Sequence, residues 1–180
     1  MFGIALRYGA IAGAIVIAVL VAGILATNEH QSQSSIFSTE WFGYTVMLVA
    51  LSTIFLAIRD HRNKNLGGVI EFLPALGLGL LIALIAGLAY VIGWEIYLNA
   101  THFQFMEHYA AAMTERARES GLTGAALQAK LVEIEQMRVG YANPLMRLPM
   151  TFLEIFPVGV LIALISAAVL RNPKVLPARA

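Results

Sequence analysis

Four long apolar runs are the feature that most constrains this chain. They cover residues 6–26, 41–58, 72–96 and 148–170. A helix needs about 20 consecutive apolar residues to cross the hydrocarbon core of a bilayer. The 180-residue sequence is 59% hydrophobic and 13% charged, whereas soluble domains are about 45–50% apolar and about 25% charged. The runs therefore predict an all-α integral membrane protein, a four-helix transmembrane bundle forming a single membrane domain over residues 1–180.

Lysine and arginine are unevenly distributed between the runs. Residues 27–40 contain none, residues 59–71 contain three, the tail after residue 170 contains three, and Arg7 precedes the first run. Cytoplasmic loops carry the excess of these residues, and tryptophan favours the membrane interfaces. Trp41 and Trp94 both fall at the outer interface if the termini are inside. We therefore expect a multi-pass protein of the cell (inner) membrane with cytoplasmic N and C termini.

The connection between the third and fourth runs is the only sizeable polar segment. Two groups of apolar residues recur there at helical spacing on either side of Gly121: Phe103, Met106, Ala110, Met113 and Ala117, then Leu127, Leu131 and Ile134. This periodicity is typical of amphipathic helices. On the predicted topology, residues 101–140 form an extracytoplasmic helical hairpin.

Small residues at four-residue spacing predict where the spans pack, because they let helix backbones approach closely in lipid. The third run carries Gly79, Ala83 and Gly87, and the fourth carries Gly159, Ala163 and Ala167. The first run carries Ala10, Ala14, Ala18 and Ala22 beside Gly9 and Gly13. The second run has no such stripe and is expected to face lipid. Such stripes bear on assembly rather than on chemistry, and sequences rich in Ala and Gly also produce them by chance.

Glu154 is the most informative single residue, because a carboxylate inside a span costs roughly 2.5–3.5 kcal/mol near the bilayer centre. Pro157 lies three residues later and cannot donate a hydrogen bond to the Leu153 carbonyl. It should therefore kink the helix beside the carboxylate. The two residues together predict a polar notch in the fourth span.

Four further polar residues are expected near the outer end of the spans: Glu95, His102, His108 and Arg147. One reading joins them with Glu154 in an outward-facing site that binds a cation, a lipid head group or a small substrate. The alternative is structural: Glu154 pairs with Arg147 as a fixed clasp, and Glu95 is merely interfacial.

Several classes of function are disfavoured. A net charge of +1 provides no basic field for nucleic acid. Cysteine is absent, and His102 and His108 are six residues apart, which does not place them on one helical face for a metal. No phosphate-binding loop, nucleophile elbow or dinucleotide fingerprint is present. We therefore expect no cofactor, no metal, no catalytic residue and no nucleic-acid partner, and the balance is against an enzyme.

Three stretches resemble a known bacterial membrane family, the domain of unknown function 4199: residues 67–72 (GGVIEF), 90–97 (YVIGWEIY) and 143–159 (NPLMRLPMTFLEIFPVG). The likeness extends over nearly the whole chain. It implies a four-span protein of the bacterial inner membrane and supplies no established activity. Its recognisable segments include Trp94, Glu95, Arg147, Glu154 and Pro157.

Three hypotheses for function follow. The leading one is a membrane-embedded binding or accessory subunit, associated with lipids and with a second copy or another membrane protein through the hairpin. The second is a small oligomeric transporter or channel component in which Glu154 binds a cation or proton. The third is a membrane enzyme that uses Glu154 and Glu95 as acid and base on a lipid-linked substrate.

Overall fold

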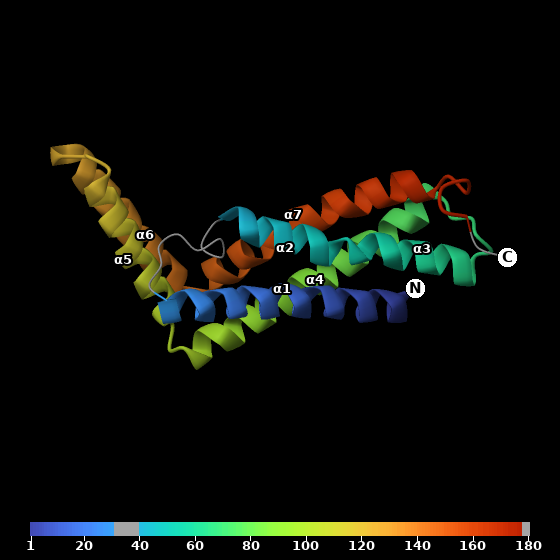
Figure 1. Ribbon diagram of the computed structural model, residues 1–180, viewed down its shortest axis with the longest axis horizontal. Coiled ribbons are helices and arrows are strands. Elements are labelled where there is room, and N and C mark those ends of the chain that lie inside the picture. The colour runs from blue at the N-terminus through green and yellow to red at the C-terminus, as the bar shows by residue number, and fades with distance from the viewer. Residues whose placement is uncertain (31–39, 178–180) are drawn as a thin grey trace. The chain divides into compact units, whose positions relative to one another are not determined.

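A computed structural model describes residues 1–30 and 40–177, which form helices and no strands (Figure 1). The helices are α1 (Phe2–His30), α2 (Glu40–Leu51), α3 (Thr53–Asn65), α4 (Phe72–Ala100), α5 (Gln104–Glu119), α6 (Gly124–Ala142) and α7 (Pro144–Leu170). In this described part, four stretches are long and apolar enough to cross a membrane: Phe2–Ile24, Gly43–Asn65, Phe72–Ala100 and Pro144–Leu170. The prediction of an all-α, four-span membrane protein is confirmed.

The chain separates into two compact units, each described here by itself. The span unit comprises Met1–Gly93 and Phe152–Ala180, and the hairpin unit comprises Trp94–Thr151. Helices α4 and α7 therefore contribute to both units.

The second span consists of α2 and α3, which continue one another along α1 (Figure 1). The junction is Ser52, whose hydroxyl donates to the Val49 carbonyl (2.6 Å), and the Thr53 hydroxyl donates to the Ala50 carbonyl (2.7 Å). Such back-bonding satisfies hydroxyls within a helix and often bends it. The side chain of Trp41, predicted at the outer interface, lies outside the described residues.

The predicted small-residue contact between the third and fourth spans is present in the span unit. A Cβ added to Gly79 would lie 2.7 Å from Ala163 Cβ, and one added to Gly159 would lie 2.7 Å from Ala83 Cβ. A Cβ on Gly87 would meet the Phe152 ring at 2.7 Å. Only glycine permits these approaches, so α4 and α7 pack closely and antiparallel along this face.

The alanine stripe predicted for the first span is wrong, whereas the Gly9–Gly13 pair predicted beside it lies at a helix contact. Ala10, Ala14, Ala18 and Ala22 are all exposed. Instead, a Cβ on Gly9 or Gly13 would come within 2.7 Å of Ile85 Cβ or 2.6 Å of Ala89 Cβ. The two glycines determine the contact face of α1 against α4 because they allow the closest approach, and the alanines are rotated away from it.

The expectation that the second span faces lipid is also wrong for one of its sides. Leu51, Ile54 and Ile58 are completely buried. Space for them comes from small residues on the partner helices, since a Cβ added to Gly79 would lie 3.3 Å from Ile54 Cγ2. A large side chain packed over glycine needs no small-residue stripe of its own.

The C-terminal end of α3 holds a buried cation that the sequence analysis did not identify. Arg62 is 0% exposed. Its Nη1 donates to the carbonyls of Leu170 (3.2 Å) and Val175 (3.0 Å), and its Nη2 donates to that of Leu176. Carbonyls at a helix C-terminus carry partial negative charge, so Arg62 caps α7 and holds the residues that follow it.

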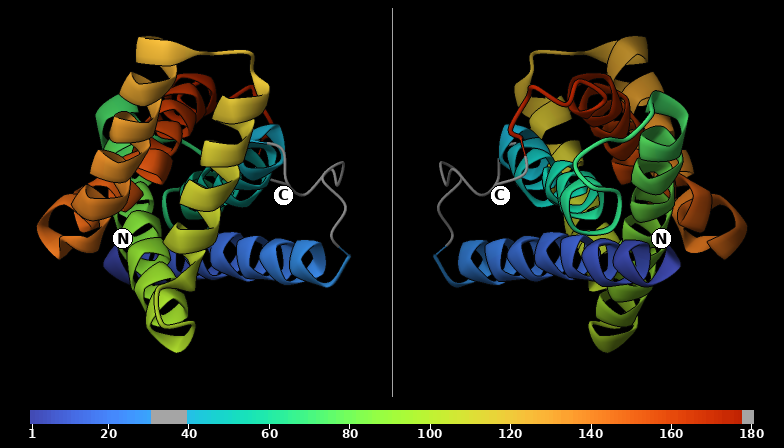
Figure 2. Two further views of the ribbon diagram at one scale, coloured as in Figure 1. Left: turned by 90° about the vertical axis from the view of Figure 1, so that its left-hand side faces the viewer. Right: turned by 90° about the vertical axis from the view of Figure 1, so that its right-hand side faces the viewer.

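In the hairpin unit, α5 and α6 lie side by side and antiparallel (Figure 2). Their shared core is small: Ala110, Ala117 and Ile134 are buried, with Met113 and Leu127 partly buried against them. The turn between the helices places Gly121 and Gly124 at positive φ (77° and 57°), where a side chain would be strained. That the pair lies outside the cytoplasm stays a prediction.

Candidate functional site

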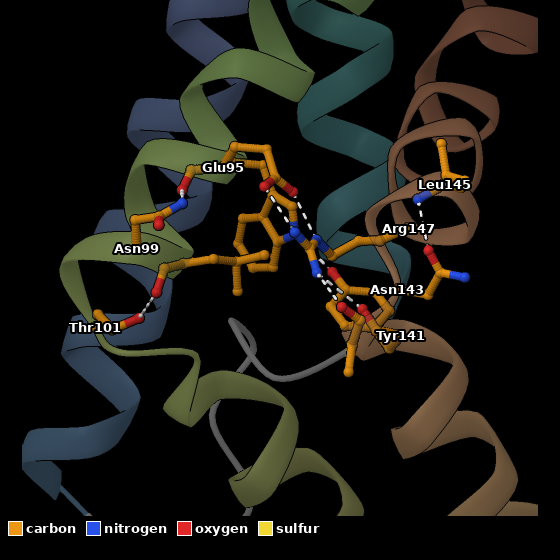
Figure 3. A network of polar contacts seen from close by, with 10 residues as sticks. Glu95, Asn99, Thr101, Tyr141, Asn143, Leu145 and Arg147 are labelled. Carbon is orange, nitrogen blue, oxygen red and sulfur yellow. Dashed lines mark hydrogen bonds and ion pairs between the residues drawn. The ribbon is translucent and has the colours of Figure 1, made fainter.

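The hairpin unit is built around an ion pair between Glu95, near the end of α4, and Arg147, in the first turns of α7 (Figure 3). Arg147 Nε donates to Glu95 Oε1 at 2.7 Å, and Nη2 donates to Oε2 at 2.8 Å. This is the two-bond geometry in which guanidinium and carboxylate match best. Arg147 is 3% exposed, and the Glu95 side chain is 24% exposed.

The remaining edge of the guanidinium binds backbone. Arg147 Nη1 donates to the carbonyls of Tyr141 (2.9 Å) and Ala142 (3.3 Å), which end α6 (Figure 3). The Phe103 ring centroid lies 5.0 Å from Arg147 Cζ and the Tyr141 ring 5.8 Å, both within cation–π distance. One arginine thus connects the end of α4, the turn before α5, the end of α6 and the start of α7.

Aromatic rings form a second layer beside the ion pair. Trp94 is buried, and its indole Nε1 donates to the Tyr141 hydroxyl at 2.7 Å. The Trp94 ring stacks on Tyr97 (5.2 Å between centroids) and meets Phe105 edge-on (4.9 Å). These contacts hold the Trp94 ring within the hairpin unit.

The turn between α4 and α5 brings Phe103 over the guanidinium. His102 and Phe103 both have positive φ (49° and 59°), a conformation that non-glycine residues adopt at a cost. The Phe103 amide donates to the Leu98 carbonyl at 2.8 Å. The surrounding contacts hold the strained turn, which ends α4 abruptly.

The start of α7 is set by Asn143 and Pro144, four residues before the predicted start at residue 148. The Asn143 side-chain oxygen accepts from the Leu145 amide at 3.0 Å (Figure 3), which is the N-cap interaction that begins helices. Proline is favoured at the first helical position. Pro149 lies inside α7 and does not prevent Arg147 from belonging to the helix.

The ion pair is extensively hydrogen-bonded. Both carboxylate oxygens of Glu95 and all three nitrogens of Arg147 are engaged in hydrogen bonds. These contacts hold both side chains in place. The arrangement acts as a clasp at the base of the hairpin. The clasp therefore joins Arg147 to Glu95, and the alternative that leaves Glu95 merely interfacial is wrong.

Glu154 belongs to the span unit and has a different partner. The Tyr90 hydroxyl of α4 donates to Glu154 Oε2 at 3.2 Å. Tyr90 is buried, whereas Glu154 and Pro157 lie on the exposed side of α7. Tyr90 was not identified from the sequence, although the register of the α4–α7 contact points to it: counting on from the Ala83–Gly159 pairing brings Tyr90 level with Phe152, beside Glu154.

The predicted cluster of five residues is thus brought together only in part. Glu95 and Arg147 meet in the hairpin unit. His102 and His108 are exposed, and no hydrogen bond or ion pair to either side chain is found among the described residues. Within residues 1–30 and 40–177, no three His, Asp or Glu side chains gather in a way that could hold a metal ion.

A charged network lies on the hairpin surface, between α5 and α6. Arg138 binds Glu135 (2.7 Å) and reaches across to Glu107 (2.7 Å). Hydrogen bonding from Arg138 lowers the pKa of Glu135, and the two carboxylates raise the pKa of Arg138. The network connects the two helices but contributes little to the stability of the hairpin, because it is exposed to solvent.

The fold and these contacts define a polytopic helical membrane protein with a helical hairpin inserted before its last span. The model of a family described as Protein of unknown function (DUF4199) matches residues 7–172, and the chain belongs to this family. The family resemblance inferred from three sequence stretches is thereby confirmed. Searches of curated proteins and of solved structures find no significant match.

Proposed function

We propose that this protein is an accessory subunit of the bacterial inner membrane, with cytoplasmic termini, that binds a helix of a partner membrane protein through the exposed face of α6. The observation that carries the proposal is a stripe of uncharged residues along that face. Ala125, Ala129, Val132, Gln136 and Val139 are all exposed and follow one another at spacings of four and three.

This spacing is the pattern of a coiled-coil seam. Residues that alternate at four and three positions line one side of a helix and pack into the holes of a facing helix. Val132 and Val139 are 53% and 58% exposed, while Ile134, on the opposite side of α6, is buried against α5. The helix is therefore apolar on two sides, and α5 covers only one.

The small core of the hairpin supports the same conclusion. Two helices with three buried side chains between them exclude little apolar surface from water. A third helix on the stripe would bury both valines. The single polar member, Gln136, is of the kind that selects register in such seams.

The clasp explains how the surface is presented. Glu95 and Arg147 bind each other and the end of α6, so the base of the hairpin is held in place. Binding to a preorganised surface costs less conformational entropy than binding to a mobile one. An ion pair engaged in such contacts supports a binding role for the hairpin.

Site-specific photo-crosslinking in the membrane tests the proposal. A photoreactive amino acid at Val132 or Val139 should give a crosslinked partner, and the matched position Ala126, exposed but about a third of a turn away on α6, should not. With the photoreactive amino acid at Val132, Val139→Glu should weaken the crosslink more than about tenfold, whereas Ala126→Glu should leave it unchanged. Equal crosslinking at all three positions, or a product of twice the chain's mass, would contradict a heterologous partner.

A further inference from the structure

Glu154 is placed on the unpacked side of a span. Leu153, Leu161 and Ile165, on the same side of α7, are more than half exposed. The opposite side of the helix is buried, at Ile155, Gly159 and Ala163. Nothing in the described part of the span unit covers the side on which Glu154 lies, so this side faces lipid or a neighbouring protein.

The depth of Glu154 follows from helix geometry. It is ten residues from Pro144, the first residue of α7, or about 15 Å along the axis at 1.5 Å per residue. The whole helix is about 40 Å long, against a hydrocarbon core of about 30 Å. With α7 centred in the bilayer, Glu154 lies about 10 Å inside the hydrocarbon.

No charged side chain among the described residues pairs with the Glu154 carboxyl. Glu154 takes part in no ion pair among the described residues, and its hydrogen-bond donor is the Tyr90 hydroxyl. Tyr90 is also the titratable group that faces it from α4. From α2, the apolar Leu51 lies beside Gly159, on the buried side of α7. Along α7, the nearest cation in sequence, Arg147, is engaged by Glu95.

Hydrocarbon tolerates a neutral carboxylic acid far better than a carboxylate. We infer that Glu154, with the Tyr90 hydroxyl as its hydrogen-bond partner, is a proton-binding site inside the membrane, reached from the lipid side of α7. The neutral form carries its proton on one carboxyl oxygen, while the other oxygen remains the acceptor for Tyr90. This site belongs to the span unit and does not depend on the proposed docking surface of α6.

A hydrophobic carbodiimide tests this inference on the wild-type protein in liposomes. A protonated carboxyl adds across one C=N bond of the reagent: a carboxyl oxygen bonds to the central carbon, and the carboxyl proton moves to a nitrogen. The O-acylisourea so formed rearranges to a stable N-acylurea, which peptide mass spectrometry detects as the mass of one added reagent molecule. We expect at least about tenfold more adduct on Glu154 than on Glu95, whose two carboxylate oxygens accept hydrogen bonds from Arg147.

Controls make the result specific. A charged, water-soluble carbodiimide should modify exposed carboxylates such as Glu133 and leave Glu154 unmodified. Tyr90→Phe, which removes the hydrogen-bond donor and leaves the carboxyl in place, should retain the Glu154 adduct. Failure of the hydrophobic reagent to modify Glu154, or equal modification by the water-soluble reagent, would overturn the inference.

Discussion

The two units use a carboxylate in opposite ways. In the hairpin unit, Glu95 meets Arg147 in a two-bond ion pair. In the span unit, Glu154 accepts from the Tyr90 hydroxyl and takes part in no ion pair with the residues that the structure describes. Each glutamate contacts a residue across the α4–α7 pair: Glu95 of α4 binds Arg147 of α7, and Glu154 of α7 binds Tyr90 of α4. A membrane carboxylate that forms an ion pair within its own protein has a structural role. One without such a partner remains available to bind a proton, as we infer for Glu154.

The largest effect should come from breaking the clasp. Arg147→Met leaves Glu95 with an unpaired, partly buried charge, and we expect the hairpin unit to lose about 3–5 kcal/mol of stability. Thermal unfolding followed by circular dichroism or by proteolysis within α5 and α6 would measure it. Glu95→Gln combined with Arg147→Met removes both charges and should recover most of the loss. If the double variant is as unstable as Arg147→Met, the charge pair is not what matters at this position.

The span unit should be more sensitive to added volume than to lost charge. Gly79→Ala places a methyl group 2.7 Å from Ala163 Cβ, and overpacking of this kind costs about 1–3 kcal/mol. Gly77→Ala is the matched control on the same helix, because no atom lies within 4 Å of an added Cβ there. Thermal stability in detergent would compare the two. Similar behaviour of the variants would show that the close α4–α7 contact does not hold the span unit together.

Glu154→Gln should have a much smaller effect than any disruption of the Glu95–Arg147 pair. The amide keeps an acceptor for the Tyr90 hydroxyl and removes a group that is poorly solvated in lipid. We expect a change within about 1 kcal/mol. Unfolding of Glu154→Gln and Glu95→Gln in the same detergent is the direct comparison. If Glu154→Gln lowers the free energy of unfolding as much as Glu95→Gln does, Glu154 has a structural role.

The spans could be predicted from the sequence because the bilayer imposes a length and a composition on each one. The α4–α7 contact could be predicted for a similar reason, since Gly79, Gly159 and Ala163 mark where backbones must approach. Continuing that register along the two runs also brings Glu95 level with Arg147, so the Glu95–Arg147 pair could have been predicted from the sequence. The pairing was not predicted because the fourth span was expected to start at residue 148, which leaves Arg147 outside the helix.

Other features depend on contacts that no local pattern encodes. Arg62 satisfies its charge with carbonyls of Leu170 and Val175, and any residue supplies a carbonyl. On α1, the four alanines of the predicted stripe are exposed, and the two glycines beside them form the contact with α4. Closeness of approach, rather than the number of small residues, determined the outcome at Gly9 and Gly13.

The smallest expected effect on stability comes from the Arg138–Glu135 ion pair on the surface of the hairpin, in contrast to the buried Glu95–Arg147 pair. The pKa of Glu135 is lowered by Arg138, so this interaction stabilises the folded state above the ordinary glutamate pKa and is lost as pH falls through the lowered value. The wild type should therefore exceed Arg138→Gln slightly in melting temperature at neutral pH, and the difference should shrink progressively as the pH falls below the ordinary glutamate value of about 4.3. Added salt should shrink it as well, because the pair is exposed. A difference that persisted in acid and in high salt would mean that Arg138 acts by packing its methylene groups between α5 and α6.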